Sequence, residues 1–261
     1  CTSSSIQNSP EIYKEIVTEN NLEILELDEN KKFLDFLEKD WNKTLDENPL
    51  FASYVGDKRL NDKINPNTIE QFNKEKQSSI ESLNDLQTIN VSNLSDDNVL
   101  NYKLYEFGVR RNIEIANFPT YFLRINQRGG IQSFYETGNR LVYTSSQDYY
   151  DWYSRLEQFS NNIKTFLEIN KVGLNKGITQ PKIITQGVVL QIDTIINSNI
   201  DSNPYMKVFL EADENLISSS EKTTLINRAK ELITNKIIPA YVDLNNFLKN
   251  EYLPNSRDSI G

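Results

Sequence analysis

Hydrophobic residues recur at three- and four-residue spacing from residue 31 onward, and this is the period of an amphipathic α-helix. The first apolar stripe consists of Phe33, Phe36, Leu37, Trp41 and Leu45. It ends before Pro49, because the residue that precedes a proline is displaced from the helical region of backbone space. The same spacing predicts further helices that begin near residues 68, 95, 145, 181 and 219.

The clearest helix signal follows Ser145, where a capping-box pattern reaches to Asp148. One face of this helix carries Tyr149, Trp152, Tyr153, Leu156, Phe159, Ile163, Phe166 and Leu167. Helical spacing favours a core position for the aromatic members over a role in lining a pocket. In the last predicted helix, Pro239 removes a backbone donor and should introduce a kink. The pattern as a whole predicts an all-α fold, an antiparallel multi-helix domain with short connections.

Residues 118–143 break the helical rhythm, and we expect one long structured loop there. Its glycine pair permits a close approach of the backbone to a ligand, and Arg128 could pair with a carboxylate. The candidate substrate-contact residues are therefore Gln127, Arg128, Gly129, Gly130 and Gln132. The alternative is a tight turn between helices in which Arg128 joins the helix ends.

The composition excludes several kinds of chemistry. Histidine is absent, which excludes Ser-His-Asp and Cys-His catalysis and any H-E-x-x-H zinc site in this sequence. The 37 acidic residues outnumber the 28 basic ones, for a net charge of −9, and this argues against nucleic acid as a partner. The acidic pairs match no calcium-loop spacing, and solvated surface positions explain them better. We therefore expect no catalytic residue, no metal site and no cofactor within these residues.

Cys1 is the single cysteine, and it stands where an initiator methionine would be expected. The polar, uncharged residues that follow it resemble the tether of a bacterial lipoprotein, in which the signal peptide is removed before an acylated cysteine. We expect residues 1–20 to be a flexible tether, Cys1 to carry a lipid anchor in a membrane, and the protein to be exported to the periplasmic or surface side of the cell envelope. The alternatives are a chance cleavage and an N-terminal nucleophile, which would need a rigid support that this segment does not offer.

Four spaced blocks resemble the bacterial domain of unknown function numbered 885. They are the W-N-K-T-L-D-E-N-P-L-F-A-S-Y-V-G-D run from Trp41 to Asp57, the N-Q-R-G-G-I-Q-S-F run from Asn126, the Tyr149–Phe166 stretch with the G-I-T-Q-P-K run from Gly177, and the segment from Ile238 that ends in E-Y-L-P-N-S-R-D-S-I-G. The resemblance covers roughly residues 38–261 in order. Members of this family are often predicted to be secreted lipoproteins.

The family resemblance implies more than these residues contain. Family members resemble zinc metallopeptidases with an H-E-x-x-H motif in the C-terminal half, and the resemblance implies zinc for the complete protein. No zinc ligand carries over to this chain, because the matching positions lie beyond Gly261. The resemblance implies that residues 21–261 form an N-terminal helical domain, truncated before the catalytic half, that serves as scaffold and substrate-cleft wall and is inactive alone. Its partners would be its own C-terminal half or a separate catalytic chain, and a peptide substrate.

A second interpretation comes from a different functional class. The protein would then be a surface lipoprotein that binds a peptide or protein partner and catalyses no reaction. The two interpretations differ in whether histidines follow Gly261 in the reading frame.

Overall fold

The structure is a computed structural model that describes residues 10–260, with side chains from residue 21 onward. The described residues form helices and connecting turns with no β-strand, so the predicted all-α fold is confirmed. Within this part of the chain, no helix combines the length and the hydrophobicity that crossing a membrane requires. Cys1, the predicted lipidation site, lies outside the described residues.

The chain folds into two compact units, each with its own hydrophobic core. Unit 1 comprises the described residues up to Lys43 together with Glu75–Asn117, and unit 2 comprises Thr44–Lys74 and the described residues from Phe118 onward. The helix α1 (Pro10–Glu47) begins within the segment 1–20 that we expected to be a tether, earlier than the apolar pattern indicated. The reason is that residues 21–28 of this helix are all exposed, so no buried stripe marks them in the sequence. Their Glu and Leu content favours a helix through intrinsic propensity alone.

Unit 1 is built from the N-terminal part of α1, the C-terminal part of α3 (Ile69–Leu86), η1 (Val91–Asn93) and α4 (Asp96–Ile115). Its core consists of Phe33, Phe36, Leu86, Ile89, Leu94 and Tyr102. Asp40 joins the three helices, because its carboxylate accepts hydrogen bonds from the hydroxyls of Ser82 on α3 and Tyr105 on α4. Of the first predicted stripe, Trp41 is an exception, with 46% of its surface exposed.

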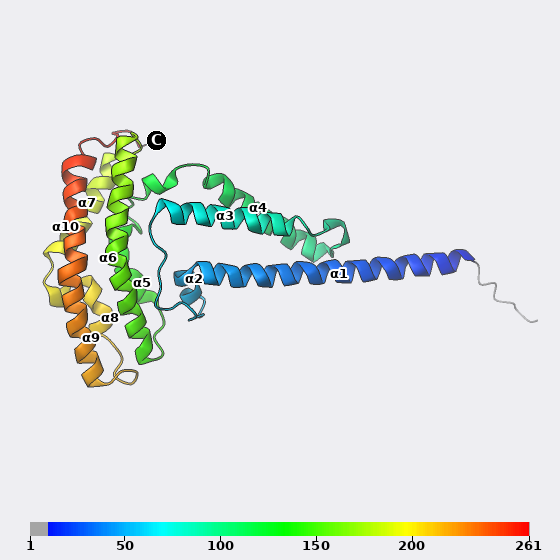
Figure 1. The fold of residues 1–261 in the computed structure, drawn as a ribbon, viewed down its shortest axis with the longest axis horizontal. Helices are drawn as coiled ribbons and strands as arrows, with labels where there is room; N and C mark the ends of the chain where they lie inside the picture. Colours follow the sequence, from blue (N-terminus) through cyan, green and yellow to red (C-terminus); the bar gives the residue numbers. More distant parts are fainter. Residues whose placement is uncertain (1–9, 261) are drawn as a thin grey trace, which may run out of the picture. The chain divides into compact units, whose positions relative to one another are not determined.

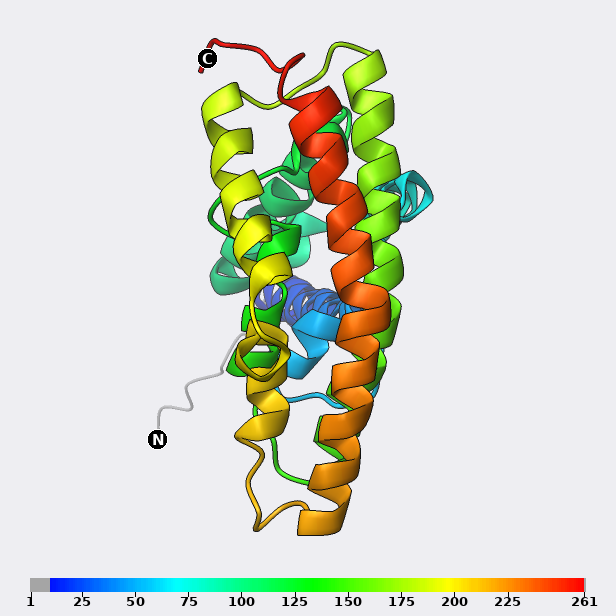
Figure 2. The ribbon, with the colours of Figure 1, turned by 90° about the vertical axis from the view of Figure 1, so that its left-hand side faces the viewer.

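Unit 2 holds the remaining elements. In chain order they are α2 (Pro49–Tyr54), η2 (Thr120–Leu123), η3 (Ile131–Ser133), α5 (Tyr135–Arg140), α6 (Ser146–Asn175), α7 (Lys182–Asn197), η4 (Ile200–Ser202), η5 (Pro204–Met206), α8 (Lys207–Leu210), α9 (Ser219–Leu232), η6 (Ile233–Ile237), α10 (Ile238–Phe247) and η7 (Leu248–Tyr252). The long helices α6, α7 and α9–α10 lie side by side, and consecutive ones run in opposite directions (Figures 1 and 2). The segment predicted as a long loop, 118–143, contains η2, η3 and α5 between its turns.

The helix α6 is the central helix of the unit 2 core. Its capping box is present as predicted, with Ser145 and Asp148 satisfying each other's backbone N–H groups. Every member of its predicted apolar stripe is buried, so the core position of its aromatic residues is confirmed. The helix ends before Gly177, whose φ of 71° is a left-handed conformation that favours glycine.

The last helix accommodates Pro239 without a break in the chain. The proline lies in the first turn of α10, and a π-helical turn, η6, directly precedes it. A π turn widens the helix by one residue, so it can absorb the missing N–H and the bulk of the ring. One apolar face of this segment is buried, with Leu225, Ala229, Leu232, Ile233, Ile237, Tyr241, Leu244 and Leu248.

Candidate functional site

The predicted substrate-contact residues lie in a turn that rests on α7. Asn126 begins this turn by accepting the backbone N–H of Arg128 on its side-chain oxygen at 2.9 Å. The next helical residues are those of η3, which lies against α7. The turn is therefore an ordered structure, built by local hydrogen bonds and by contacts with a long helix.

Three glutamine side chains fasten the turn to α7. Gln127 Nε2 donates to the carbonyl of Ile183 at 2.9 Å, and Gln191 Nε2 returns a bond of 3.1 Å to the carbonyl of Gln127. Gln132 is 2% exposed, and its Nε2 donates to Gln191 Oε1 at 2.7 Å and to the carbonyl of Asn126 at 2.8 Å. Two of the five candidates, Gln127 and Gln132, thus use their amides within the fold.

Two glycines make this close fit feasible. A Cβ at Gly130 would lie 2.4 Å from the backbone oxygen of Asn126, so no larger residue fits there without a shift of the turn. Gly187 leaves space for the turn on the α7 side, because a Cβ at that position would lie 2.1 Å from Gln127 Nε2. The side chain of Gln127 therefore crosses the helix at its one residue without a side chain.

A buried tyrosine of the core also holds the same turn through a hydrogen bond. Tyr241 of α10 donates its hydroxyl hydrogen to the carbonyl of Ile131 at 2.8 Å, and its oxygen lies 2.6 Å from that of Tyr205. Burial raises the pKa of both tyrosines well above the usual value, so both hydroxyls stay protonated and able to donate. The turn is thereby fixed to two different helices.

Arg128 is the candidate whose side chain is free for another role. Its side chain is exposed, and within the described part of the chain its guanidinium has no hydrogen-bond or ion-pair partner. On α7, Ile183 is 62% exposed and Leu190 is 68% exposed. They flank Gly187 at helical spacing and so lie on the face that Gln127 crosses. We call Arg128, Ile183 and Leu190 the loop face.

A buried arginine on α6 is a second feature, and the sequence analysis did not single it out. Arg155 is 0% exposed, and its Nη2 donates to Ser53 Oγ at 2.7 Å and to the carbonyl of Pro49 at 3.2 Å. Its Nε donates to the carbonyl of Lys63 at 2.9 Å, while its Nη1 has no partner in the described residues. Burial lowers the pKa of this guanidinium. The sequence signal that could have identified it is a charged residue directly beside Leu156 of the apolar stripe of α6. An arginine that is fully buried with such a stripe seldom lacks hydrogen-bond partners.

Two turns before Arg155, the buried carboxylate of Asp148 on α6 forms an ion pair with Lys58, whose side chain is 40% exposed. Lys58 Nζ lies 2.6 Å from Asp148 Oδ2 and 2.7 Å from Oδ1, and the backbone N–H of Thr144 donates to Oδ2 at 2.7 Å. Burial by itself raises the pKa of Asp148, but the hydrogen bonds from Lys58 and Thr144 outweigh it, so the pKa lies below its usual value. Together, Arg155 and Asp148 tie the segment from Pro49 to Lys63 to the central helix.

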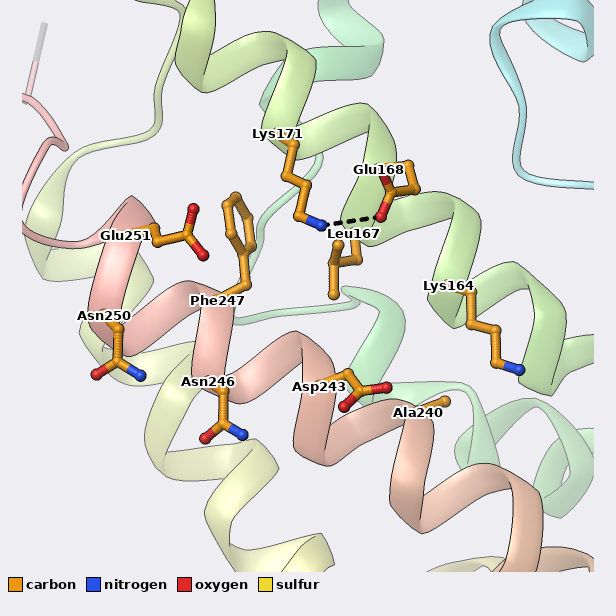
Figure 3. A pocket seen from close by; sticks show the side chains of 10 residues that line it. All are labelled: Lys164, Leu167, Glu168, Lys171, Ala240, Asp243, Asn246, Phe247, Asn250 and Glu251. Carbon is orange, nitrogen blue, oxygen red and sulfur yellow. Dashed lines mark hydrogen bonds and ion pairs between the residues drawn. The ribbon is translucent and has the colours of Figure 1, made fainter.

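An open groove of about 470 Å³ runs between α6 and α10 (Figure 3). Its floor is apolar, with Leu167 and Phe247, and none of the five predicted contact residues lines it. The α6 wall carries Lys164 and an ion pair from Lys171 Nζ to Glu168 Oε1 at 3.0 Å. The α10 wall and the turn after it carry Asp243, Asn246, Asn250 and Glu251, whose side chains make no polar contact with described residues.

The residues of this chain do not fit the zinc that the family resemblance implies for the complete protein. The sequence contains no histidine. Over the described residues, no three side chains of Cys, Asp or Glu come together as a set that could hold a metal ion. No step of chemistry is therefore assigned to zinc in these residues.

Comparisons with known proteins place the chain in a family. In a crystal structure from Colwellia psychrerythraea, described as that of a "putative lipoprotein", the matching region has 15% sequence identity and a TM-score of 0.66. The match covers 91% of this chain and 42% of that chain, so these residues span less than half of its length. A comparison with curated proteins finds no significant match. The model of the family described as "Bacterial protein of unknown function (DUF885)" matches residues 49–261, and the chain belongs to this family.

Proposed function

We propose that this chain is the N-terminal helical scaffold and substrate-cleft domain of an exported lipoprotein that resembles zinc-dependent peptidases, and that it is inactive alone. The support for a lipoprotein is the Colwellia neighbour, which is described as one. The support for a partial chain is that the neighbour continues well beyond the matching region. The catalytic part would be its own C-terminal half or a separate chain, and zinc would be held there. Lipidation of Cys1 would retain the protein at the cell envelope.

The observation that carries the cleft role is the loop face. The turn carries the guanidinium of Arg128, which has no partner among the described residues, and its Gln127 is bonded to α7, where Ile183 and Leu190 are exposed. A guanidinium binds a carboxylate with two parallel hydrogen bonds, and exposed aliphatic groups gain free energy when a ligand covers them. A peptide with a carboxylate next to an apolar side chain has both complementary groups.

The test is Arg128→Ala in the complete protein, with a mixture of synthetic peptides as substrate and mass spectrometry as readout. We expect turnover to fall about tenfold or more, the size of one charge-assisted hydrogen bond, while the melting temperature is unchanged. Arg128→Lys should retain part of the activity. The control is Arg140→Ala, which removes an exposed ion pair with Glu136 on α5 and should change neither quantity.

Two results would contradict this proposal. An equal loss of turnover and melting temperature in Arg128→Ala would show that Arg128 only stabilises the turn. A stop codon directly after Gly261, with no separate chain that confers activity, would leave the enzymatic interpretation without a catalytic part.

The groove between α6 and α10 supports the second candidate function, a lipoprotein that binds a peptide and catalyses no reaction. The amides of Asn246 and Asn250 have no partner among the described residues and can pair with a peptide main chain, and the groove walls carry charges of both signs for the peptide termini. Labelled peptide pools should then bind with an affinity that Asn246→Arg reduces by at least about tenfold. Asn161→Arg, an exposed change on α6 outside the groove, is the matched control. Equal binding by both variants would exclude the groove.

A further inference from the structure

The exposed side of α4 in unit 1 carries an apolar stripe without a partner in the described residues. Leu100, Leu104 and Phe107 are 58%, 61% and 67% exposed, and Ile115 is 43% exposed. At 100° per residue these four lie within an arc of about 80° on the helix. The core residue Tyr102 points to the opposite side of α4, so packing within unit 1 leaves the stripe uncovered.

Two opposite charges on α4 lie at equal distances along the chain from Leu104. Asp97 lies seven residues before Leu104, and Arg111 lies seven residues after it. Seven residues are two helical turns less about 20°, so all three share one face of the helix. Neither charged side chain has a hydrogen-bond or ion-pair partner in the part of the chain that the structure describes. By contrast, the neighbouring Arg110 forms an ion pair with Glu106, one turn earlier on the same helix.

We propose that α4 pairs with α4 of a second copy of this chain, antiparallel, about a two-fold axis at Leu104. In this register, Leu104 meets Leu104 of the other copy, and each Asp97 faces the other copy's Arg111. Leu100 faces Gly108, where a Cβ would have no heavy atom within 4 Å, so the two helices can approach closely. The surface is the same on both copies, as a two-fold axis requires.

The charges on α4 favour an antiparallel second copy over a parallel pair and over an anionic membrane surface. A parallel pair would bring Asp97 against Asp97 and Arg111 against Arg111, and like charges would oppose it. A membrane surface rich in anionic lipid is disfavoured by Asp96 and Asp97 at the start of the helix and by the net charge of −9. A helix of 20 residues is about 30 Å long, and one such face buries less than about 800 Å² per copy. The dimer should therefore be weak and reversible.

The test is sedimentation equilibrium of the chain at about 5–500 µM, in reducing buffer so that Cys1 forms no disulfide. Asp97→Arg and Arg111→Asp should each raise the dissociation constant about tenfold, because two ion pairs become two repulsive contacts. The double variant Asp97→Arg/Arg111→Asp should restore the association, because the pairs re-form with exchanged charges. Leu104→Asp should abolish it.

A matched control separates pairing from effects on the helix. Asp96→Arg makes the same charge change in the same first turn, but 100° around the helix from Asp97, and should leave the dissociation constant unchanged. Circular dichroism checks that each variant keeps its helix content. Monomers at every concentration, association that survives Leu104→Asp, or a double variant no better than the singles would each overturn the proposal. Binding of the monomer to anionic vesicles that Leu104→Asp removes would also overturn it, in favour of a lipid surface.

Discussion

The buried carboxylate of Asp148 makes the stability of unit 2 depend on pH in a definite direction. Its pKa in the folded protein lies below the usual value. A depressed pKa stabilises the fold at pH values above the unfolded pKa of about 3.9, and this contribution is lost as the pH falls through the folded pKa. Acidification should therefore loosen the tie between α6 and the segment that holds Lys58.

We expect Asp148→Asn to lower the free energy of unfolding by about 2 kcal/mol at pH 7, because Lys58 and the N–H of Thr144 lose a charged acceptor. The difference between wild type and variant should shrink as the pH falls below about 4. Thermal melts from pH 7 to pH 3 measure this. Asp258→Asn, which removes an exposed ion pair with Lys182, should cost less than about 0.5 kcal/mol at every pH. A constant difference across the pH range would contradict the assignment.

Asp148 and Arg155, the two buried charged residues of α6, show which features the sequence can and cannot predict. Asp148 was predicted as a capping residue, because a capping box is a local pattern of four residues. Arg155 was not predicted, because its acceptors are Pro49, Ser53 and Lys63, about a hundred positions earlier in the chain. Local patterns predict local bonds, and the burial of a charge depends on long-range ones.

At the scale of elements, local sequence predicted the existence of the candidate turn, but it did not predict which helix the turn is attached to. The glycine pair and the polar residues around it identified a turn with a special backbone. The structure adds that the amides of Gln127 and Gln132 are used to fasten it, with Gln191 and Gly187 of α7 as partners. Those partners lie about 60 residues later, and in the sequence α7 shows only its apolar stripe. Similarly, the apolar period predicted helices wherever a face is buried, and missed the exposed start of α1.

Gly187→Ala tests this attachment between two elements. The new Cβ would displace the amide of Gln127, which loses its bonds to the carbonyls of Ile183 and Ile184. The loss of about 1–2 kcal/mol is offset by about 1 kcal/mol of helix propensity. We therefore expect a small change in melting temperature, together with clearly faster hydrogen exchange at residues 126–132, measured by mass spectrometry.

A double variant provides the control for this prediction. In Gln127→Ala/Gly187→Ala no amide is left to collide, so the combined effect on stability should be smaller than the sum of the single effects. Unchanged exchange at residues 126–132 in Gly187→Ala would show that other contacts alone hold the turn. The bond from Tyr241 to Ile131 would then be the main support.

At the scale of the whole molecule, the two units have cores of very different size. Among the residues whose side chains the structure describes, the core cluster of unit 1 has six buried side chains, and that of unit 2 has 31. A small core buries less apolar surface relative to the chain entropy that folding must overcome. We therefore expect the two units to open with different free energies, unit 1 first, so that no single melting temperature describes the chain.

Two core substitutions distinguish the units. Phe33→Ala should cost about 3–5 kcal/mol in unit 1, and Leu156→Ala about 2–5 kcal/mol in unit 2. Hydrogen exchange in low denaturant reads each effect separately: Phe33→Ala should speed exchange in α4 and leave α6 and α10 protected, while Leu156→Ala should speed exchange in α6 and α10. If Phe33→Ala unfolds unit 1 outright, Phe33→Leu provides a milder change of the same core. Equal loss of protection in α4 and α6 after Phe33→Ala would show that the two cores unfold as one cooperative structure.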